Sequence, residues 1–180
     1  ARFAANRFRF PGVDINARLF RNYPQGVSAS HAIGYIGRIN DKDLEALEAK
    51  EKLSNYRGSD HLGKIGIEES YEDELHGQTG FEQVEIDAGG RAVRSLNREE
   101  PIAGNNLILS LDLKLQQITE KAFGKYRGSL VAIDPKNGEI LAFVSQPGFD
   151  PNLFVDGIDQ VSWDEYNNSP EKPLNNRAIR

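Results

Sequence analysis

Two continuously apolar segments in the C-terminal part constrain the fold of this chain more than any other feature. Residues 130–133 and residues 140–144 contain only apolar side chains, and the turn-forming residues 134–138 separate them. This spacing predicts a β-hairpin, and strands that are apolar on both faces need cover on both faces. We therefore expect this hairpin in the middle of a sheet with helices packed on it.

The sequence around the hairpin predicts a second domain that is incomplete. Residues 107–111 are expected to form a strand, and Asp112 is expected to cap a helix that ends at Gly124. After the hairpin, the pattern indicates only one short helix, near residues 161–167. One short helix is too little cover for a sheet that is apolar on both faces.

The first part of the chain has a different pattern, with alternating strands and surface helices. Apolar and polar residues alternate over residues 13–20, and residues 83–96 predict a second hairpin with a Gly-Gly turn. Asn40 is a candidate N-cap for a helix, and a further helix carries Ile67, Tyr71 and Leu75. The polar stretch between these helices, residues 50–60, is expected to be a loop.

The change of pattern near residues 97–106 predicts a domain junction. We expect one domain over residues 1–103 and a second, incomplete one over residues 104–180, both of the α+β class. No repeat of 20–50 residues is visible in the sequence, so a solenoid architecture is not indicated.

Composition excludes several classes of function. The formal net charge is −5, and no basic cluster is present, which argues against nucleic acid as a partner. No apolar run approaches the ~20 residues that cross a bilayer. The chain has no cysteine, which excludes disulfides, thiol catalysis and thiolate metal sites. Methionine is also absent, even at position 1, so we expect a piece of a longer protein whose membrane anchor lies outside it.

The candidate catalytic residues give no convincing site. His31, His61 and His76 are isolated, and we interpret them as loop or turn histidines with a hydrogen bond rather than as metal ligands. The chain contains no complete phosphate-binding loop, and its paired carboxylates are typical of solvated helix faces. We therefore assign no catalytic, cofactor-binding or metal-binding residue and expect no cofactor.

One serine, Ser169, begins a short motif that matches a known catalytic pattern. Ser169 and Lys172 fit the S-x-x-K pattern of penicillin-interacting enzymes, in which one helical turn places the lysine amine beside the serine hydroxyl. Pro173 directly follows the lysine and disfavours a helical conformation at Lys172. A loose S-x-N match at Ser95 precedes this motif, whereas in those enzymes it follows. We interpret both matches as coincidental.

Several segments resemble conserved boxes of the class B penicillin-binding proteins. Two groups of segments resemble boxes of the non-catalytic module of that family, and Arg21 and Glu68 form the natural charged pair between them. Two further segments resemble the opening of the transpeptidase domain, and a last one is typical of the cell-elongation type. In chain order the segments are residues 21–26 with 31–37, residues 63–68 with 71–75 and 77–80, residues 109–117, residues 131–142, and residues 150–158.

The resemblance implies an elongated pedestal of the dimerisation type followed by the first strands and helix of a transpeptidase domain. The parent would be anchored at the periplasmic face of the bacterial inner membrane. It would cross-link peptidoglycan stem peptides through an acyl-serine, bind penicillin, and work with elongation proteins such as RodA and MreC. The family's catalytic motifs would lie beyond Arg180, so no catalytic role passes to a residue of this chain.

Two other interpretations stay open on the sequence alone. The chain could be a free-standing periplasmic interaction module without enzyme activity. It could also belong to a septal or a bifunctional relative, although residues 150–158 resemble the elongation type more closely. An S-x-x-K motif within about one helix length downstream of Arg180 would decide for the transpeptidase.

Overall fold

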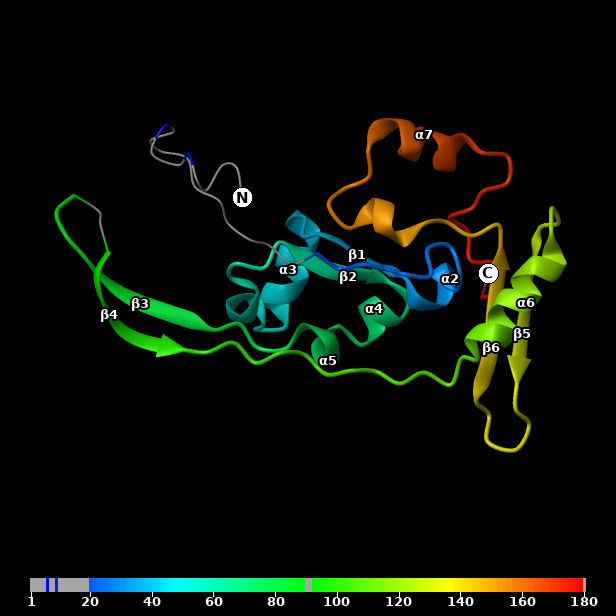
Figure 1. Ribbon diagram of the computed structural model, residues 1–180, viewed down its shortest axis with the longest axis horizontal. Coiled ribbons are helices and arrows are strands. Elements are labelled where there is room, and N and C mark those ends of the chain that lie inside the picture. The colour runs from blue at the N-terminus through cyan, green and yellow to red at the C-terminus, as the bar shows by residue number, and fades with distance from the viewer. Residues whose placement is uncertain (1–5, 7–8, 10–19, 90–91, 180) are drawn as a thin grey trace.

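The described residues form three separate sheets, each two-stranded and antiparallel. They are spread along an elongated body in the computed structural model, which describes residues 6, 9, 20–89 and 92–179 (Figure 1). The expectation of an α+β chain is confirmed. The strand predicted for residues 13–20 lies outside the described residues, apart from Phe20.

The central sheet pairs β1 (Tyr35–Arg38) with β2 (His61–Ile65). Four helices and one 3₁₀ turn surround it: α2 (Ser30–Ile33), α3 (Asp41–Ala49), η2 (Leu53–Tyr56), α4 (Gly66–Ser70) and α5 (Glu72–His76). The predicted N-cap at Asn40 is confirmed, because its side chain accepts the Asp43 N–H at 3.0 Å. The loop predicted over residues 50–60 contains η2, which carries the buried Tyr56.

The helix expected through Ile67 and Leu75 is divided into α4 and α5. Tyr71 stands between them with φ −114° and ψ 24°, outside the helical region. This break lets the Glu72 carboxylate accept the Tyr56 hydroxyl at 2.9 Å and the Gly63 N–H at 2.8 Å. Period-four spacing could not reveal the break, because the hydrogen bonds that favour it come from residues distant in sequence.

The third and fourth strands form a hairpin at one end of the body (Figure 1). The prediction of this hairpin is confirmed, with β3 (Phe81–Ile86) paired to β4 (Ala92–Glu99). Its register shifts twice, between Gln83 and Val84 and between Glu85 and Ile86, which indicates bulges on β4. Both faces carry exposed apolar side chains, so the hairpin is a projecting arm and not part of a core.

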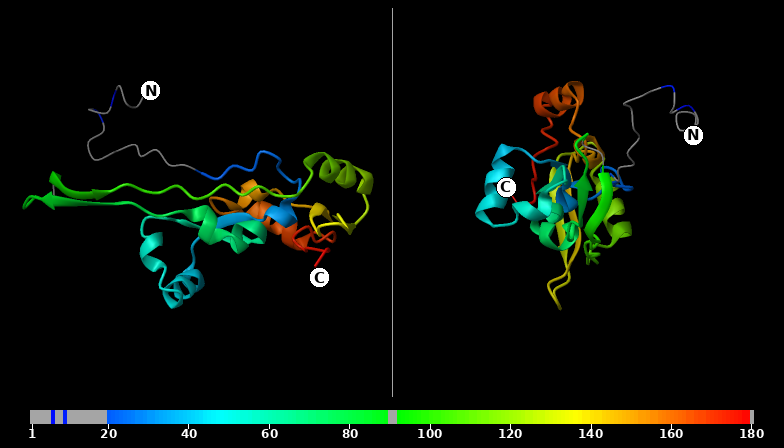
Figure 2. Two further views of the ribbon diagram at one scale, coloured as in Figure 1. Left: turned by 90° about the horizontal axis from the view of Figure 1, so that it is seen from below. Right: turned by 90° about the vertical axis from the view of Figure 1, so that its left-hand side faces the viewer.

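An extended segment, residues 100–112, connects this hairpin with the opposite end of the molecule (Figure 2). Backbone hydrogen bonds hold the segment at two places. Ile102 forms a β-bridge with Gln78, and the Asn105 N–H donates to Glu74 O at 2.7 Å. The strand expected at residues 107–111 was wrong. Among the described residues, only the end of the segment reaches a strand, that of residues 140–146: Asp112 N–H donates to Leu141 O at 2.8 Å and Ser110 Oγ to Ile140 O at 2.9 Å. One backbone hydrogen bond is too few for a ladder.

The C-terminal part contains α6 (Leu113–Phe123), β5 (Gly128–Ile133), β6 (Ile140–Gln146), η3 (Pro151–Phe154) and α7 (Gln160–Asn168). The predicted Asp112 cap, hairpin and final helix are all confirmed. Helix α6 packs on β6, where Ala142 and Val144 are fully buried. The β5–β6 hairpin was expected in the middle of a larger sheet. Among the described residues it forms a sheet of only two strands, and Leu130 and Ile133 on β5 are 41% and 56% exposed.

Within residues 20–89 and 92–179, no helix has both the length and the apolar character needed to cross a bilayer.

Candidate functional site

A buried carboxylate links the two sequence boxes near the N-terminus. Glu68 is 5% exposed, and its Oε2 accepts a hydrogen bond from Arg21 Nη2 at 3.1 Å. Its Oε1 accepts a hydrogen bond from the Tyr23 hydroxyl at 3.1 Å. The same hydroxyl oxygen accepts a hydrogen bond from the Ile36 N–H at 2.9 Å. The predicted pairing of Arg21 with Glu68 is confirmed. Tyr23 is a third residue in this hydrogen-bonded group, and the charge pattern of the sequence did not indicate it.

The environment of Tyr23 fixes its protonation. Burial raises the pKa of the Tyr23 phenol well above its ordinary value, and the negative charge of Glu68 raises this pKa further. The phenol therefore stays protonated at neutral pH and can donate its hydrogen bond. As a result Tyr23 links the carboxylate of α4 to the backbone of β1.

The same tyrosine is held on its other side by a residue from the far end of the chain. Asn152, in η3, accepts the Tyr23 N–H at 2.9 Å and donates its amide to Tyr23 O at 3.0 Å. Asp150 fixes the Asn152 side chain through its own carboxylate, at 2.8 Å. The two hydrogen bonds between Asn152 and the Tyr23 backbone resemble those of a β-bridge. They join segments that are 129 residues apart in sequence.

A second set of contacts holds residues 28–29 against α6. Glu120 accepts hydrogen bonds from Ser28 Oγ at 2.7 Å, from Ala29 N at 2.9 Å and from Gln116 Nε2 at 2.7 Å. Gln116 is 1% exposed, and its amide bonds both the N–H and the carbonyl of Phe143 on β6. Residues 28–29, α6 and β6 therefore share one hydrogen-bond network.

An aromatic cluster fills the space between these two sets of contacts. Phe149 is 1% exposed and packs edge-on against His31, Tyr35 and Phe154, with ring centroids 5.0, 5.9 and 5.6 Å apart. The Phe149 N–H donates to Ser30 Oγ at 3.3 Å. We call this combined region, residues 21–35 with 116–120 and 143–154, the joint. It fixes the direction of the C-terminal part relative to the central sheet.

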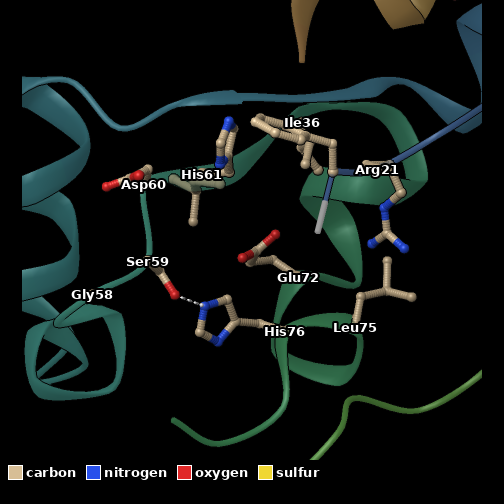
Figure 3. Close-up of a pocket in the computed structure, with 11 residues that line it drawn as sticks. Arg21, Ile36, Gly58, Ser59, Asp60, His61, Glu72, Leu75 and His76 are labelled. Atoms are coloured by element: carbon tan, nitrogen blue, oxygen red, sulfur yellow. Dashed lines mark hydrogen bonds between the residues drawn. The ribbon is translucent and has the colours of Figure 1, made fainter. Parts of the chain in front are cut away.

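A cleft of about 680 Å³ opens beside the central sheet (Figure 3). Ser59 Oγ lies 3.0 Å from His76 Nε2 in this cleft, a pair that nucleophilic catalysis could use. A catalytic base needs a third group that fixes its tautomer, but His76 Nδ1 is 3.4 Å from both Asn55 Nδ2 and Gly77 O. We therefore interpret the hydrogen bond as a structural link between the loop after η2 and α5.

The three histidines differ more than the sequence suggested. His76 has the expected hydrogen bond, but it is the last residue of α5 and not part of a loop. His31 is buried in α2, and His61 lies on β2, each with a buried Nε2 that has no hydrogen-bond partner in the described part of the chain. The described residues contain no cluster of His, Asp and Glu side chains that could hold a metal ion.

The S-x-x-K match does not form a catalytic pair. Lys172 has φ 44°, outside the helical region, as the following proline predicted. Its Nζ donates to Asn167 O at 2.9 Å, while Ser169 Oγ accepts the Glu171 N–H at 3.2 Å. The serine and the lysine thus have separate backbone partners.

Comparison with protein families explains the arrangement of pedestal and joint. The family model for the "Penicillin-binding Protein dimerisation domain" matches residues 1–109, and that for the "Penicillin binding protein transpeptidase domain" matches residues 128–180. The chain belongs to the class B penicillin-binding proteins. The junction predicted at residues 103–104 stays a prediction, since the two matches leave residues 110–127 between them.

Individual proteins similar to this chain include peptidoglycan D,D-transpeptidases and penicillin-binding protein 2 structures. The chain is 49% identical to the peptidoglycan D,D-transpeptidase MrdA of Escherichia coli over all 180 residues. It is also similar to penicillin-binding protein 2 of Pseudomonas aeruginosa, with 41% identity and a TM-score of 0.74 over 89% of this chain and 31% of that one. The chain spans 28% of the length of the Escherichia coli relative.

A third similar structure is a complex of penicillin-binding protein 2 with MreC from Helicobacter pylori. It matches with 32% identity and a TM-score of 0.83, over 98% of this chain and 32% of that chain. The correspondence covers the central sheet, the hairpin arm and the joint together, because almost the whole chain is included.

Proposed function

We propose that this chain is the pedestal and the opening of the catalytic domain in a peptidoglycan D,D-transpeptidase of cell elongation. The parent enzyme would cross-link stem peptides through an acyl-serine intermediate and would be inhibited by β-lactams. The segment described above would contribute no reacting group. It would hold the catalytic domain at a fixed distance and direction from an anchor at the periplasmic face of the inner membrane.

The observation that carries this proposal is the joint. Residues from the dimerisation-domain match donate to Glu120 and exchange two hydrogen bonds with Asn152, which is part of the transpeptidase match. Hydrogen bonds to a charged group such as the Glu120 carboxylate contribute about 1.5–3 kcal/mol each, and neutral ones such as those with Asn152 about 0.5–1.5 kcal/mol each. Together these contacts favour one orientation of the two modules. A flexible tether between independent modules would not need side chains placed in this way.

A partner-binding role for the pedestal is the second part of the proposal. The Helicobacter pylori relative with the highest of the reported TM-scores is bound to MreC, and the hairpin arm here exposes Phe81, Ile86 and Val93 by more than half. Exposed apolar side chains on an isolated hairpin favour burial against a partner. We propose an MreC-type protein as that partner, and RodA as a further one.

The binding experiment uses the periplasmic part of MreC from the bacterium that encodes this chain. We expect a complex by analytical ultracentrifugation, weakened at least tenfold by the pair of changes Phe81→Ser and Ile86→Ser. Val161→Ser, on the exposed face of α7 away from the arm, is the matched control and should leave binding unchanged. Absence of any complex with the unmodified chain would contradict the partner proposal.

Acylation provides a separate test of the non-catalytic role. This chain should not be labelled by a fluorescent penicillin, because the only S-x-x-K match holds its serine and lysine apart. Intact Escherichia coli MrdA serves as the positive control. Labelling of the chain that disappears in Ser169→Ala would show that the match is a real site and would contradict the assignment.

A further inference from the structure

His31 occupies a position in the joint that the proposed support function does not explain. It lies in α2 and is 6% exposed, with its ring edge-on to Phe149 at 5.0 Å. Asn176, near the C-terminal end, donates its side-chain amide to His31 O at 3.3 Å. The residue is therefore enclosed by three segments: α2, the turn after β6 and the C-terminal segment.

The surroundings of the ring suit a neutral imidazole. Its Nε2 is buried and makes no hydrogen bond within the described residues. The carbonyls of Pro147 and Pro173 face the ring and would favour a proton, while the positive charge of Arg177 opposes one. Burial of the ring opposes the charged imidazole more strongly than the two carbonyls favour it, so the closed joint favours the neutral form.

Other charged groups nearby do not compensate. The groove of about 740 Å³ beside His31 is lined by two carboxylates, Glu69 of α4 and Glu139 of the β5–β6 turn, and by the phenol of Tyr71. Neither carboxylate makes a hydrogen bond or an ion pair with the His31 ring. The ring in contact with His31 is that of Phe149, which packs in turn against Phe154 and Tyr35, and this aromatic cluster carries no charge.

We propose that His31 is a pH-sensitive latch of the joint: the neutral ring packs between α2 and the turn at Phe149, and its protonation opens that contact. Opening would expose the ring to water and release the Phe149 N–H from Ser30 Oγ. The latch would thereby loosen the catalytic domain from the pedestal in acid and hold it at neutral pH.

The sign of the pH dependence follows from the burial of the ring. Burial lowers the pKa of His31 below its ordinary value of 6.5, and Arg177 lowers it further. The open form, with a solvated ring, takes up a proton first. The closed joint is thus fully stable above about pH 6.5 and loses stability as the pH falls below that value.

Hydrogen exchange of three amides that cross the joint tests the proposal: Tyr23, Ala29 and Phe149. Protection factors, corrected for intrinsic exchange, should fall by up to about 30-fold between pH 7.5 and pH 5.0. His31→Gln should remove most of this dependence. The matched controls His61→Gln and His76→Gln, which lie outside the joint, should keep it.

Direct titration of His31 in the unmodified chain tests the proposal even if the His31→Gln variant does not fold. We expect the His31 ring signals in NMR to titrate below pH 6.5 in step with the loss of protection at Phe149. The proposal is overturned if His31 titrates at or above pH 6.5. It is equally overturned if His31→Gln folds and the fall in protection persists unchanged.

Discussion

Replacing Gly34 by alanine should lower the free energy of unfolding by roughly 4 kcal/mol or more. Gly34 ends α2 with φ 80° and ψ −156°, a region that side chains rarely enter. A Cβ at this position would also stand only 1.8 Å from Ile65 O, which is backbone and cannot move aside alone. The close approach of the turn after α2 to Ile65 should therefore be lost.

Gly138 provides the matched control for this prediction. Its φ is 78°, close to that of Gly34, but an added Cβ would meet nothing within 4 Å. Gly138→Ala should thus cost only the ~1–2 kcal/mol of the left-handed conformation. Urea unfolding followed by circular dichroism measures both changes. Equal losses for the two variants would show that close backbone contact at Gly34 contributes nothing.

Removing the charge of Arg21 should have the second-largest effect. Arg21→Met keeps an apolar side chain but leaves the Glu68 carboxylate, 5% exposed, with only the Tyr23 hydroxyl as a donor. Breaking a fully buried pair costs ~3–5 kcal/mol. Because the Arg21 side chain is 39% exposed, we expect a smaller loss of about 2–3 kcal/mol.

A double-mutant cycle separates the pair from its surroundings. Glu68→Gln keeps an acceptor for Tyr23 and should cost less than Arg21→Met, and the double variant should cost less than the sum of the two changes. Arg94→Met breaks the exposed pair with Glu85, whose side chains are 69% and 50% exposed, and should cost no more than about 1 kcal/mol. Additive losses at Arg21 and Glu68 would contradict the buried ion pair.

Local signals predicted much of the fold. The Asn40 and Asp112 caps, the hairpin through Gln83 and the apolar strands of β5 and β6 depend on residues close in sequence, and all were found. The rest of the fold depends on contacts between residues that are distant in sequence. Tyr71 breaks a helix because Glu72 is bonded by Tyr56 and Gly63, and no periodicity contains that information.

The candidate site shows the same division. The pairing of Arg21 with Glu68 was predicted from their opposite charges together with the resemblance of their two segments to family boxes. Asn152 and Glu120 were not predicted as joint residues, because an amide and a carboxylate are ordinary surface groups until the fold brings them to Tyr23 and Ala29. The burial of His31 was missed because an isolated histidine gives no sign of its surroundings in a single sequence.

Exchange of this segment into a relative tests the central proposal most directly. The 180 residues would replace the matching residues of Escherichia coli MrdA, to which they are 49% identical, in cells depleted of the native protein. We predict a chimera that is labelled by fluorescent penicillin and restores rod shape, with Gly34→Ala losing both and Gly138→Ala keeping both. A chimera that is stably produced and labelled but leaves the cells round would contradict a supporting role of this segment in elongation.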